Sequence, residues 1–332
     1  MSTMPRVLLG KTGLSVSKFC LGSMQFGWTS DERQSFAVMD SFVAAGGNFI
    51  DTADIYSRWH EGNRGGESEE IIGRWMKARG NRDEVIVATK LRGPMWDGPD
   101  GEGLSRSHVM RAAEHSLKRL QVETIDLYQC HWFDEKTPIE ETLRAFEDLV
   151  KAGKVRHIGA SNYPPALLTA ALAAAKEHSL PAFATLQPHH SLVHRKEYED
   201  GLQAVCASEG LGVVPYSPLA GGFLTGKYTK GGAAMKSARA GGVKQYFSHE
   251  GWTALDAVRE VAAKHETSCA AVALAWQMAT PGITAPIVGA NTPEQLAEQL
   301  PALDLRLTAD DLSQLDAASR PFLLKGDVHP GR

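Results

Sequence analysis

The amino-acid sequence predicts an α/β protein that forms a closed (β/α)8 barrel, or TIM barrel, with an N-terminal β-hairpin closing the bottom. Short strand-like runs alternate with longer helical patterns almost from end to end, as in βα units around a parallel sheet. Eight such units follow one another without a strong internal linker. No G-x-G-x-x-G motif is present, which disfavours an open, doubly wound sheet. We therefore expect one domain, 1–332.

Apolar runs rich in β-branched and aromatic residues are the predicted strands. They lie near residues 19–23, 47–51, 85–90, 126–131, 155–160, 184–188, 212–216 and 284–288. Helical patterns lie near residues 31–45, 67–79, 105–120, 138–152, 164–178, 197–209, 251–278 and 293–300. The seventh helical pattern is expected to be broken in two. Thr137 before Pro138 and Thr292 before Pro293 are typical helix start signals.

Three segments lie outside the eight repeats. Residues 1–18 contain RVLLG-KTG-LSVSK, whose alternation around a Lys-Thr-Gly turn predicts the hairpin. Residues 220–250 are rich in glycine and lysine and too long for an ordinary connection, so we expect an irregular, functional loop. Residues 301–332 are expected to hold a last helix near 308–319 and a tail.

Composition excludes several classes of partner. A formal charge of -4, a pI near 6.3 and the lack of a long Lys/Arg run indicate neither nucleic-acid nor membrane binding. The 4 cysteines, at positions 20, 130, 206 and 269, form no C-x-x-C pair and are expected to be reduced thiols. The N-terminus lacks a signal-peptide pattern, and no apolar run is long enough to cross a bilayer. These features predict a cytoplasmic protein; they leave its oligomeric state open.

The polar residues that end the predicted strands are the candidate active site, because barrels of this kind carry their chemistry at the carboxyl ends of the strands. Asp51 and Tyr56 follow the second strand, and Lys90 and His131 end the third and fourth. A cationic lysine beside a phenol lowers the pKa of the phenol from about 10. The phenol can then donate a proton, and a histidine can orient a carbonyl oxygen. Together these four residues indicate a site that protonates a developing alkoxide.

The chain resembles the aldo-keto reductase superfamily over nearly its whole length. The landmarks are LGKTGLSVS, DTADIY, VATK, QCH, GKVRHIGASN, YSPLAGGFLTGKY and PIVGANTPEQL. The resemblance implies a barrel that binds a nicotinamide cofactor without a Rossmann motif and reduces a small aldehyde or ketone to an alcohol, or the reverse. It makes Tyr56 the general acid and His131 the group that orients the carbonyl. Lys90 and Asp51 would be the pair that lowers the pKa of Tyr56.

The resemblance also implies a cofactor site for NADPH, with NADH as the alternative. Ser161, Asn162 and Gln187 would hydrogen-bond the carboxamide, and Tyr216 would stack on the nicotinamide ring. The other positions that it assigns to the cofactor are Gly22, Ser23, Met24, Asp51, Ser217, Leu219, Gly221, Lys227, Gly289, Asn291, Thr292, Gln295 and Gln299.

Two of these positions depart from the pattern of the superfamily. Many relatives carry Arg or Lys where Asn291 stands, and Asn where Gln299 stands. The usual preference for a 2'-phosphate would then be weaker, because a charge-assisted hydrogen bond is roughly twice as strong as a neutral one. Lys236 and Arg239, in the loop 220–250 on the cofactor side, are candidates to supply the missing charge.

Four tryptophans are candidate substrate contacts. Trp28, Trp59, Trp96 and Trp132 follow the first four predicted strands, around the expected mouth of the barrel. As a set they predict a substrate with a sizeable apolar or ring-shaped face. The polar insert SRWHEGNRGGE after Tyr56 could contact hydroxylated molecules.

Three alternatives stay open from the residues. A metal-dependent hydrolase would use His131, His189, His190 and Asp51, but the first strand lacks H-x-H spacing, so we predict no metal. A Schiff-base aldolase would use Lys90 as its nucleophile. A cofactor-binding regulatory subunit, similar to ion-channel β subunits, would keep the same barrel.

Overall fold

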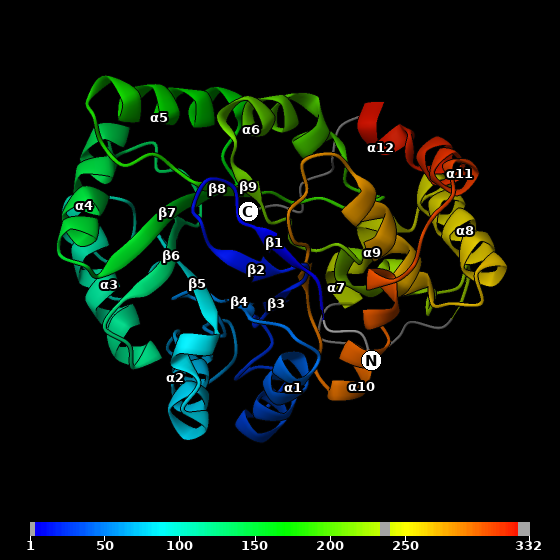
Figure 1. Cartoon of the computed structure of the whole chain (residues 1–332), viewed down its shortest axis with the longest axis horizontal. Helices are drawn as coiled ribbons and strands as arrows, with labels where there is room; N and C mark the ends of the chain where they lie inside the picture. The colour runs from blue at the N-terminus through cyan, green and yellow to red at the C-terminus, as the bar shows by residue number, and fades with distance from the viewer. Residues whose placement is uncertain (1–3, 233–239, 325–332) are drawn as a thin grey trace.

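The computed structural model in Figure 1 describes residues 4–232 and 240–324. Its main sheet has 8 strands in the order β10-β3-β4-β5-β6-β7-β8-β9, and each neighbouring pair is parallel. The strands are β3 (Cys20–Gly22), β4 (Phe49–Asp51), β5 (Ile86–Leu91), β6 (Ile125–Cys130), β7 (Val155–Ser161), β8 (Thr185–Gln187), β9 (Gly212–Val213) and β10 (Ile287–Val288).

Backbone hydrogen bonds join the two ends of this sheet. The amide of Thr284 donates to the carbonyl of Val213 at 2.9 Å, and the amide of Ile287 donates to that of Pro215 at 2.9 Å. These contacts close the sheet on itself and confirm the predicted (β/α)8 barrel. β9 and β10 are shorter than the predicted strands, and Pro215 and Pro286 are the reason, since a proline has no amide proton for a ladder.

The predicted helices are all present, with small shifts at their ends. They are α1 (Glu32–Ala44), α2 (Glu67–Arg79), α3 (Arg106–Leu120), α4 (Ile139–Lys151), α5 (Pro165–Glu177), α6 (Gln203–Glu209), α8 (His249–Lys264), α9 (Cys269–Ala279), α10 (Pro293–Ala297) and α11 (Ala309–Ser319). The long pattern 251–278 is indeed two helices, α8 and α9. Four short helical turns lie between or after these helices: η1 (Arg82–Glu84), the π-turn η2 (Tyr198–Leu202), η5 (Leu300–Leu303) and α12 (Pro321–Leu324).

The N-terminal hairpin closes the bottom of the barrel, as predicted. β1 (Arg6–Leu8) and β2 (Ser15–Ser17) pair antiparallel, and the amide of Leu9 donates to the carbonyl of Leu14 across the turn. Leu9 and Val16 are wholly buried against Phe49 and other residues inside the barrel. Figure 1 shows the hairpin, in blue, lying across the centre of the barrel.

Residues 220–250 are more regular than predicted. The described part contains η3 (Ala220–Thr225), α7 (Ala240–Val243) and η4 (Lys244–Tyr246). Phe223 and Tyr246 are buried in an apolar cluster with Trp252 of α8, and this packing favours helical turns over an open loop. Lys236 and Arg239 lie outside the described residues. Across the described residues, no helix is long and apolar enough to span a membrane.

Candidate active site

The ammonium group of Lys90 is the centre of the site. Its Nζ donates hydrogen bonds to Asp51 Oδ2 at 2.6 Å, to the carbonyl of Thr52 at 2.7 Å and to the hydroxyl of Tyr56 at 3.0 Å. Lys90 is fully buried, and Asp51 is 2% exposed. Three partners use all three ammonium protons, so the group can hold its charge without water. The sequence had no signal for the carbonyl of Thr52, because every residue carries one.

Strand geometry brings these residues together. Asp51 is in register with Ala88, two residues before Lys90, and side chains two apart on a strand lie on the same face. The amide of Asp54 donates to the carbonyl of Lys90, which holds the loop that carries Tyr56 against β5. Burial opposes the charge on Lys90, but Asp51 and Tyr56 outweigh it and raise the pKa of Lys90 above its usual value.

Gln187 and Ser23, which the sequence predicted for the cofactor, both bond to Asp51 in the structure. Gln187 Nε2 donates to Asp51 Oδ1 at 2.8 Å, and Ser23 Oγ donates to the carbonyl of Asp51 at 2.8 Å. Ser23 Oγ also accepts a hydrogen bond from Ser68, so its hydroxyl both donates and accepts within a buried chain. Gly22 has no room for a side chain, since a Cβ there would lie 2.6 Å from Ile287. Met24 is half-buried beside them.

His131 follows β6, beside the phenol. Its ring lies edge-on to that of Tyr56, with centroids 5.9 Å apart, and stacks on Trp132 at 3.9 Å. Burial, and then the charges of Lys90 and Arg92, lower the pKa of His131 well below its usual value. The imidazole is therefore neutral and can donate from only one ring nitrogen. Among the described residues no partner reaches its buried Nδ1.

Asn162 links three of the predicted site residues. Its Nδ2 donates to the carbonyl of His131 at 2.9 Å and to Ser161 Oγ at 3.1 Å, and its Oδ1 accepts from the hydroxyl of Tyr216 at 2.8 Å. Its φ is 56°, in the left-handed region that residues other than glycine rarely adopt. The structure thus brings Ser161, Asn162 and Tyr216 into one network with His131.

Two histidines stack behind Tyr216. The ring of His189 lies 4.9 Å from that of Tyr216 at an interplanar angle of 13°, and the ring of His194 lies 3.5 Å from that of His189. The sequence named His189 only as a nominal metal ligand and missed this support, because stacking depends on side-chain direction. Flat rings in this order hold Tyr216 rigidly in place.

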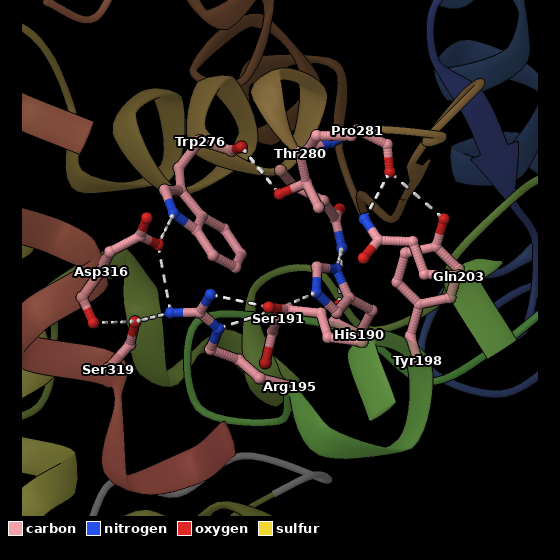
Figure 2. Close-up of polar contacts among 12 residues, drawn as sticks. His190, Ser191, Arg195, Tyr198, Gln203, Trp276, Thr280, Pro281, Asp316 and Ser319 are labelled. Atoms are coloured by element: carbon pink, nitrogen blue, oxygen red, sulfur yellow. Dashed lines mark hydrogen bonds and ion pairs between the residues drawn. The ribbon is translucent and has the colours of Figure 1, made fainter. Parts of the chain in front are cut away.

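The next residue, His190, lies in a buried polar hub that Figure 2 shows in close-up. His190 Nε2 bonds to Glu199 at 3.0 Å, and its carbonyl accepts from Gln277 of α9 at 2.6 Å. Arg195 pairs with Glu199 through two hydrogen bonds of 2.7 Å and reaches Asp316 of α11 at 3.1 Å. The hub ties the segment after β8 to α9 and α11.

The hub also places His190 among Glu199, Gln277 and Trp276 instead of beside His131. In the parts of the chain that the structure describes, no group of three or more His, Cys, Asp or Glu side chains could hold a metal ion. The residues named for a metal-dependent hydrolase therefore do not form a ligand cluster.

The loop after β9 has an unusual backbone. Ser217 and Ala220 have φ values of 58° and 50°, and Gly221 also lies in the left-handed region. Such strain occurs at functional sites. Leu219 is half-buried, and Lys227 is exposed, with its Nζ 5.4 Å from the ring centroid of Tyr228.

The predicted adenosine end is held by amides and hydroxyls. Asn291 Oδ1 accepts from the hydroxyls of Thr29 at 2.7 Å and Ser30 at 3.1 Å. The backbone amide of Asn291 donates to Gln295 Oε1. The other members of this end are the exposed Gly289, the cap residue Thr292 and the buried Gln299, which donates to the carbonyl of Gly289. With α10 only 5 residues long, the helix contributes little dipole to a phosphate.

The structure brings three of the four tryptophans to the site. The rings of Trp28 and Trp59 are 5.5 Å apart, Trp59 lies 6.2 Å from Tyr56, and Trp132 stacks on His131. Trp96 instead stacks on His108 and lies under Arg111, both on α3. The loop after β5 packs Trp96 against α3, which its position in the sequence could not indicate.

Comparison with known proteins identifies the family. The aldo/keto reductase family model matches residues 18–320. The chain belongs to the aldo/keto reductase family. It is therefore an oxidoreductase of this family, whose members typically use NAD(P)H and act on small carbonyl compounds.

Three relatives illustrate the range of this family. An uncharacterized oxidoreductase YrpG of Bacillus subtilis is 40% identical, over 97% of this chain and 95% of the relative. A probable voltage-gated potassium channel subunit beta of rice, Oryza sativa subsp. japonica, is 32% identical over 93% and 94%. A norsolorinic acid reductase of Aspergillus flavus is 31% identical over 96% and 81%.

Proposed function

We propose that this protein reduces an aldehyde or ketone to an alcohol, or catalyses the reverse reaction, with NADPH as its preferred cofactor and Tyr56 as the proton donor. One observation carries the proposal: the buried ammonium of Lys90 donates at the same time to the carboxylate of Asp51 and to the phenol oxygen of Tyr56. This arrangement stabilises a phenolate, which is the species that remains after Tyr56 gives up its proton.

Each residue would have a distinct part in the reaction. The nicotinamide, when bound, supplies a hydride to the carbonyl carbon. Tyr56 gives its hydroxyl proton to the carbonyl oxygen, and Lys90 neutralises the phenolate that forms. Asp51 keeps Lys90 charged and in place. The neutral ring of His131, at the edge of Tyr56, orients the carbonyl oxygen with a hydrogen bond.

The residues around Tyr216 fit a nicotinamide ring. Both Nδ2 protons of Asn162 are used within the protein, but its Oδ1 has a second lone pair that can accept from a carboxamide. No described donor bonds to Gln187 Oε1, which can do the same. The ring of Tyr216, supported from behind by His189, supports the proposal of a stacking surface.

The amide at Asn291 predicts weak discrimination between NADPH and NADH, since an amide can bond to a ribose hydroxyl or to a phosphate. A steady-state screen of aldehydes, sugars and cyclic ketones with both cofactors in parallel tests the activity and the preference together. The cytoplasmic location and the single domain stay predictions.

Replacement of Tyr56 by phenylalanine is the direct test. Tyr56→Phe removes only the hydroxyl, so kcat for carbonyl reduction should fall by several orders of magnitude while cofactor affinity, measured by fluorescence titration, stays nearly the same. A Tyr56→Phe enzyme with near-normal reduction would show that another group is the general acid.

A second candidate function is a cofactor-binding regulatory subunit, favoured by the similarity to the rice protein whose name describes a potassium channel β subunit. Multiple-turnover kinetics separate the two. A regulatory subunit would bind NADPH but convert each bound molecule at most once on the time scale of an assay.

A further inference from the structure

We propose that the substrate carries an anionic group, a carboxylate or a phosphate, which Arg92 and Arg58 bind at the mouth of the barrel. This inference rests on the proposed function, since it concerns the substrate of the same site. The two arginines stand two residues after Lys90 and two residues after Tyr56.

The position of Arg92 follows from strand pairing. Leu91 is in register with Cys130, and the amide of His131 donates to the carbonyl of Leu91, so Arg92 lies beside His131 where β5 and β6 end. Two residues along a strand span about 7 Å on the same face. β5 ends at Leu91, so this spacing gives only the reach of the backbone and not the direction of the Arg92 side chain. The charge of Arg92 lowers the pKa of His131, which indicates that the guanidinium lies near that ring. A small substrate with its carbonyl at Tyr56 can bridge this distance.

The backbone of Arg92 is unusual. Its φ is 122°, in the region that favours glycine, and its carbonyl accepts a hydrogen bond from the amide of Gly103 at 2.9 Å. Glycine would adopt this φ with less strain than arginine. The presence of arginine there indicates that its side chain has a function. Ser57, immediately before Arg58, is also strained, with a φ of 73°.

Both guanidinium groups have buried nitrogens without acceptors. Arg92 Nε and Arg58 NH1 are buried, and neither arginine forms a side-chain hydrogen bond or an ion pair within the two described stretches. By contrast, the buried arginines elsewhere are paired: Arg119 with Glu69 at 2.6 Å and Arg195 with Glu199 at 2.7 Å. A buried N–H without an acceptor is unfavourable, and a bound anion would supply the missing acceptor.

Nearby acids form no described ion pair with these arginines. Asp134 is charged and partly offsets Arg92, but its oxygens accept from the amides of Leu104 and Lys136 and from the hydroxyl of Thr137. The acids of the loop after β5, which are Asp97, Asp100 and Glu102, are exposed and form no described ion pair with either arginine. His131 is neutral, so a net positive charge remains.

The anion belongs to the substrate rather than to the cofactor because of where these loops lie. Arg92 follows β5, whereas the nicotinamide end of the predicted cofactor site, at Asn162 and Tyr216, follows β7 and β9 across the barrel. The adenosine end follows β10 and β3, and only Arg58, after β4, has a neighbouring strand there. The effect of Arg92→Gln on NADPH affinity therefore separates the two sites. A guanidinium near the carbonyl-orienting His131 would select aldehydes or ketones that carry a carboxylate or phosphate a few bonds away.

The test compares matched substrates that differ in charge. With NADPH, kcat/KM is measured for 4-carboxybenzaldehyde and its methyl ester, and for glyceraldehyde 3-phosphate and glyceraldehyde, so that the two pairs separate carboxylate from phosphate. The wild-type enzyme should prefer the anion of at least one pair by about 10-fold or more. Arg92→Gln should abolish most of that preference, Arg58→Gln should reduce it, and Arg92→Lys should keep part of it. The exposed Arg33→Gln, on α1, is the matched control and should keep the full preference.

Three results would overturn the proposal. They are an equal rate for both members of each pair in the wild type, an unchanged preference in Arg92→Gln, and an Arg92→Gln effect that is as large on NADPH affinity as on the substrate. If no carbonyl compound is reduced, the proposed function fails. Calorimetric titration of the NADPH-loaded protein with 4-carboxybenzaldehyde and glyceraldehyde 3-phosphate then decides the anion site, which requires binding of at least one that Arg92→Gln weakens.

Discussion

At the scale of single residues, the site depends on how completely Lys90 is bonded. Asp51 joins Lys90 through Oδ2 and Gln187 through Oδ1, so one carboxylate holds both the charge beside Tyr56 and the amide at the end of β8. Removing either partner of a buried ion pair leaves an uncompensated charge, which is strongly unfavourable. Substitutions of Lys90 and of Asp51 should therefore affect the activity differently.

Lys90→Met should abolish most of the activity, because it removes the cationic donor that stabilises the phenolate of Tyr56. Asp51→Asn should reduce activity less, since an amide oxygen can still accept from Lys90. Without the Asp51 carboxylate the pKa of Lys90 falls. As the pH rises, Lys90 in Asp51→Asn should therefore lose its proton, and the enzyme its activity, at a lower pH than in the wild type. A Lys90→Met enzyme with an unchanged rate and pH profile would contradict this arrangement.

Several strained residues lie in the loops that follow strands. Ser57, Arg92, Asn162 and Ser217 follow β4, β5, β7 and β9, and each has a positive φ although it is not glycine. Strain of this kind costs about 1–3 kcal/mol for each residue and persists only where surrounding contacts require it. Two of these positions, Asn162 and Ser217, are predicted cofactor residues, and Ser57 and Arg92 lie close in sequence to Tyr56 and Lys90.

At the scale of elements, the hairpin turn approaches the barrel very closely. Gly10 has a φ of 53°, and a Cβ there would lie 2.4 Å from the amide nitrogen of Gly212 on β9. Gly13, in the same turn, has a φ of 76° but no atom within 4 Å of a Cβ. Comparison of the two glycines therefore separates the cost of close packing, which applies only to Gly10, from the cost of a positive φ, which applies to both.

Gly10→Ala should lower the free energy of unfolding by about 2–4 kcal/mol, because strain and a backbone clash add. Gly13→Ala should lower it by only about 1 kcal/mol, the cost of a positive φ with a Cβ. Urea unfolding followed by tryptophan fluorescence measures both. Equal losses would mean that the hairpin moves freely and does not pack against β9.

At the scale of the whole molecule, buried histidines make stability depend on pH. Burial lowers the pKa of His190 in the hub of Figure 2, and burial lowers that of His131 in the active site. In the unfolded chain each histidine takes up a proton near pH 6.5, whereas the folded protein keeps it neutral. Their contribution to stability is therefore complete above about pH 6.5 and is lost as the pH falls below it.

The free energy of unfolding should accordingly decrease between pH 7.5 and 5.5, by up to about 1.4 kcal/mol per pH unit for each such histidine. Urea unfolding at several pH values measures the slope. His190→Gln should reduce the slope, and the exposed His60→Gln should leave it unchanged. A slope that His190→Gln does not alter would assign the pH dependence to other groups.

The alternation of short apolar runs with helical patterns was enough to predict the barrel, its hairpin and the helices, because burial of one face imposes a period of two or about 3.6 on the residues. The same reading placed Asp51, Tyr56, Lys90 and His131 at one mouth, because the carboxyl ends of parallel strands in a barrel meet there. Those conclusions depend only on order along the chain.

Tertiary structure alone decided the contacts between residues far apart in the sequence. It placed Gln187 beside Asp51, packed Trp96 against α3, stacked His189 behind Tyr216 and buried His190 in the hub. Each of these depends on the direction of a side chain and on what packs against it, and the period of a sequence does not specify either. The carbonyl of Thr52 and the unpaired Nε of Arg92 became visible for the same reason, since hydrogen-bond partners exist only once the chain has folded.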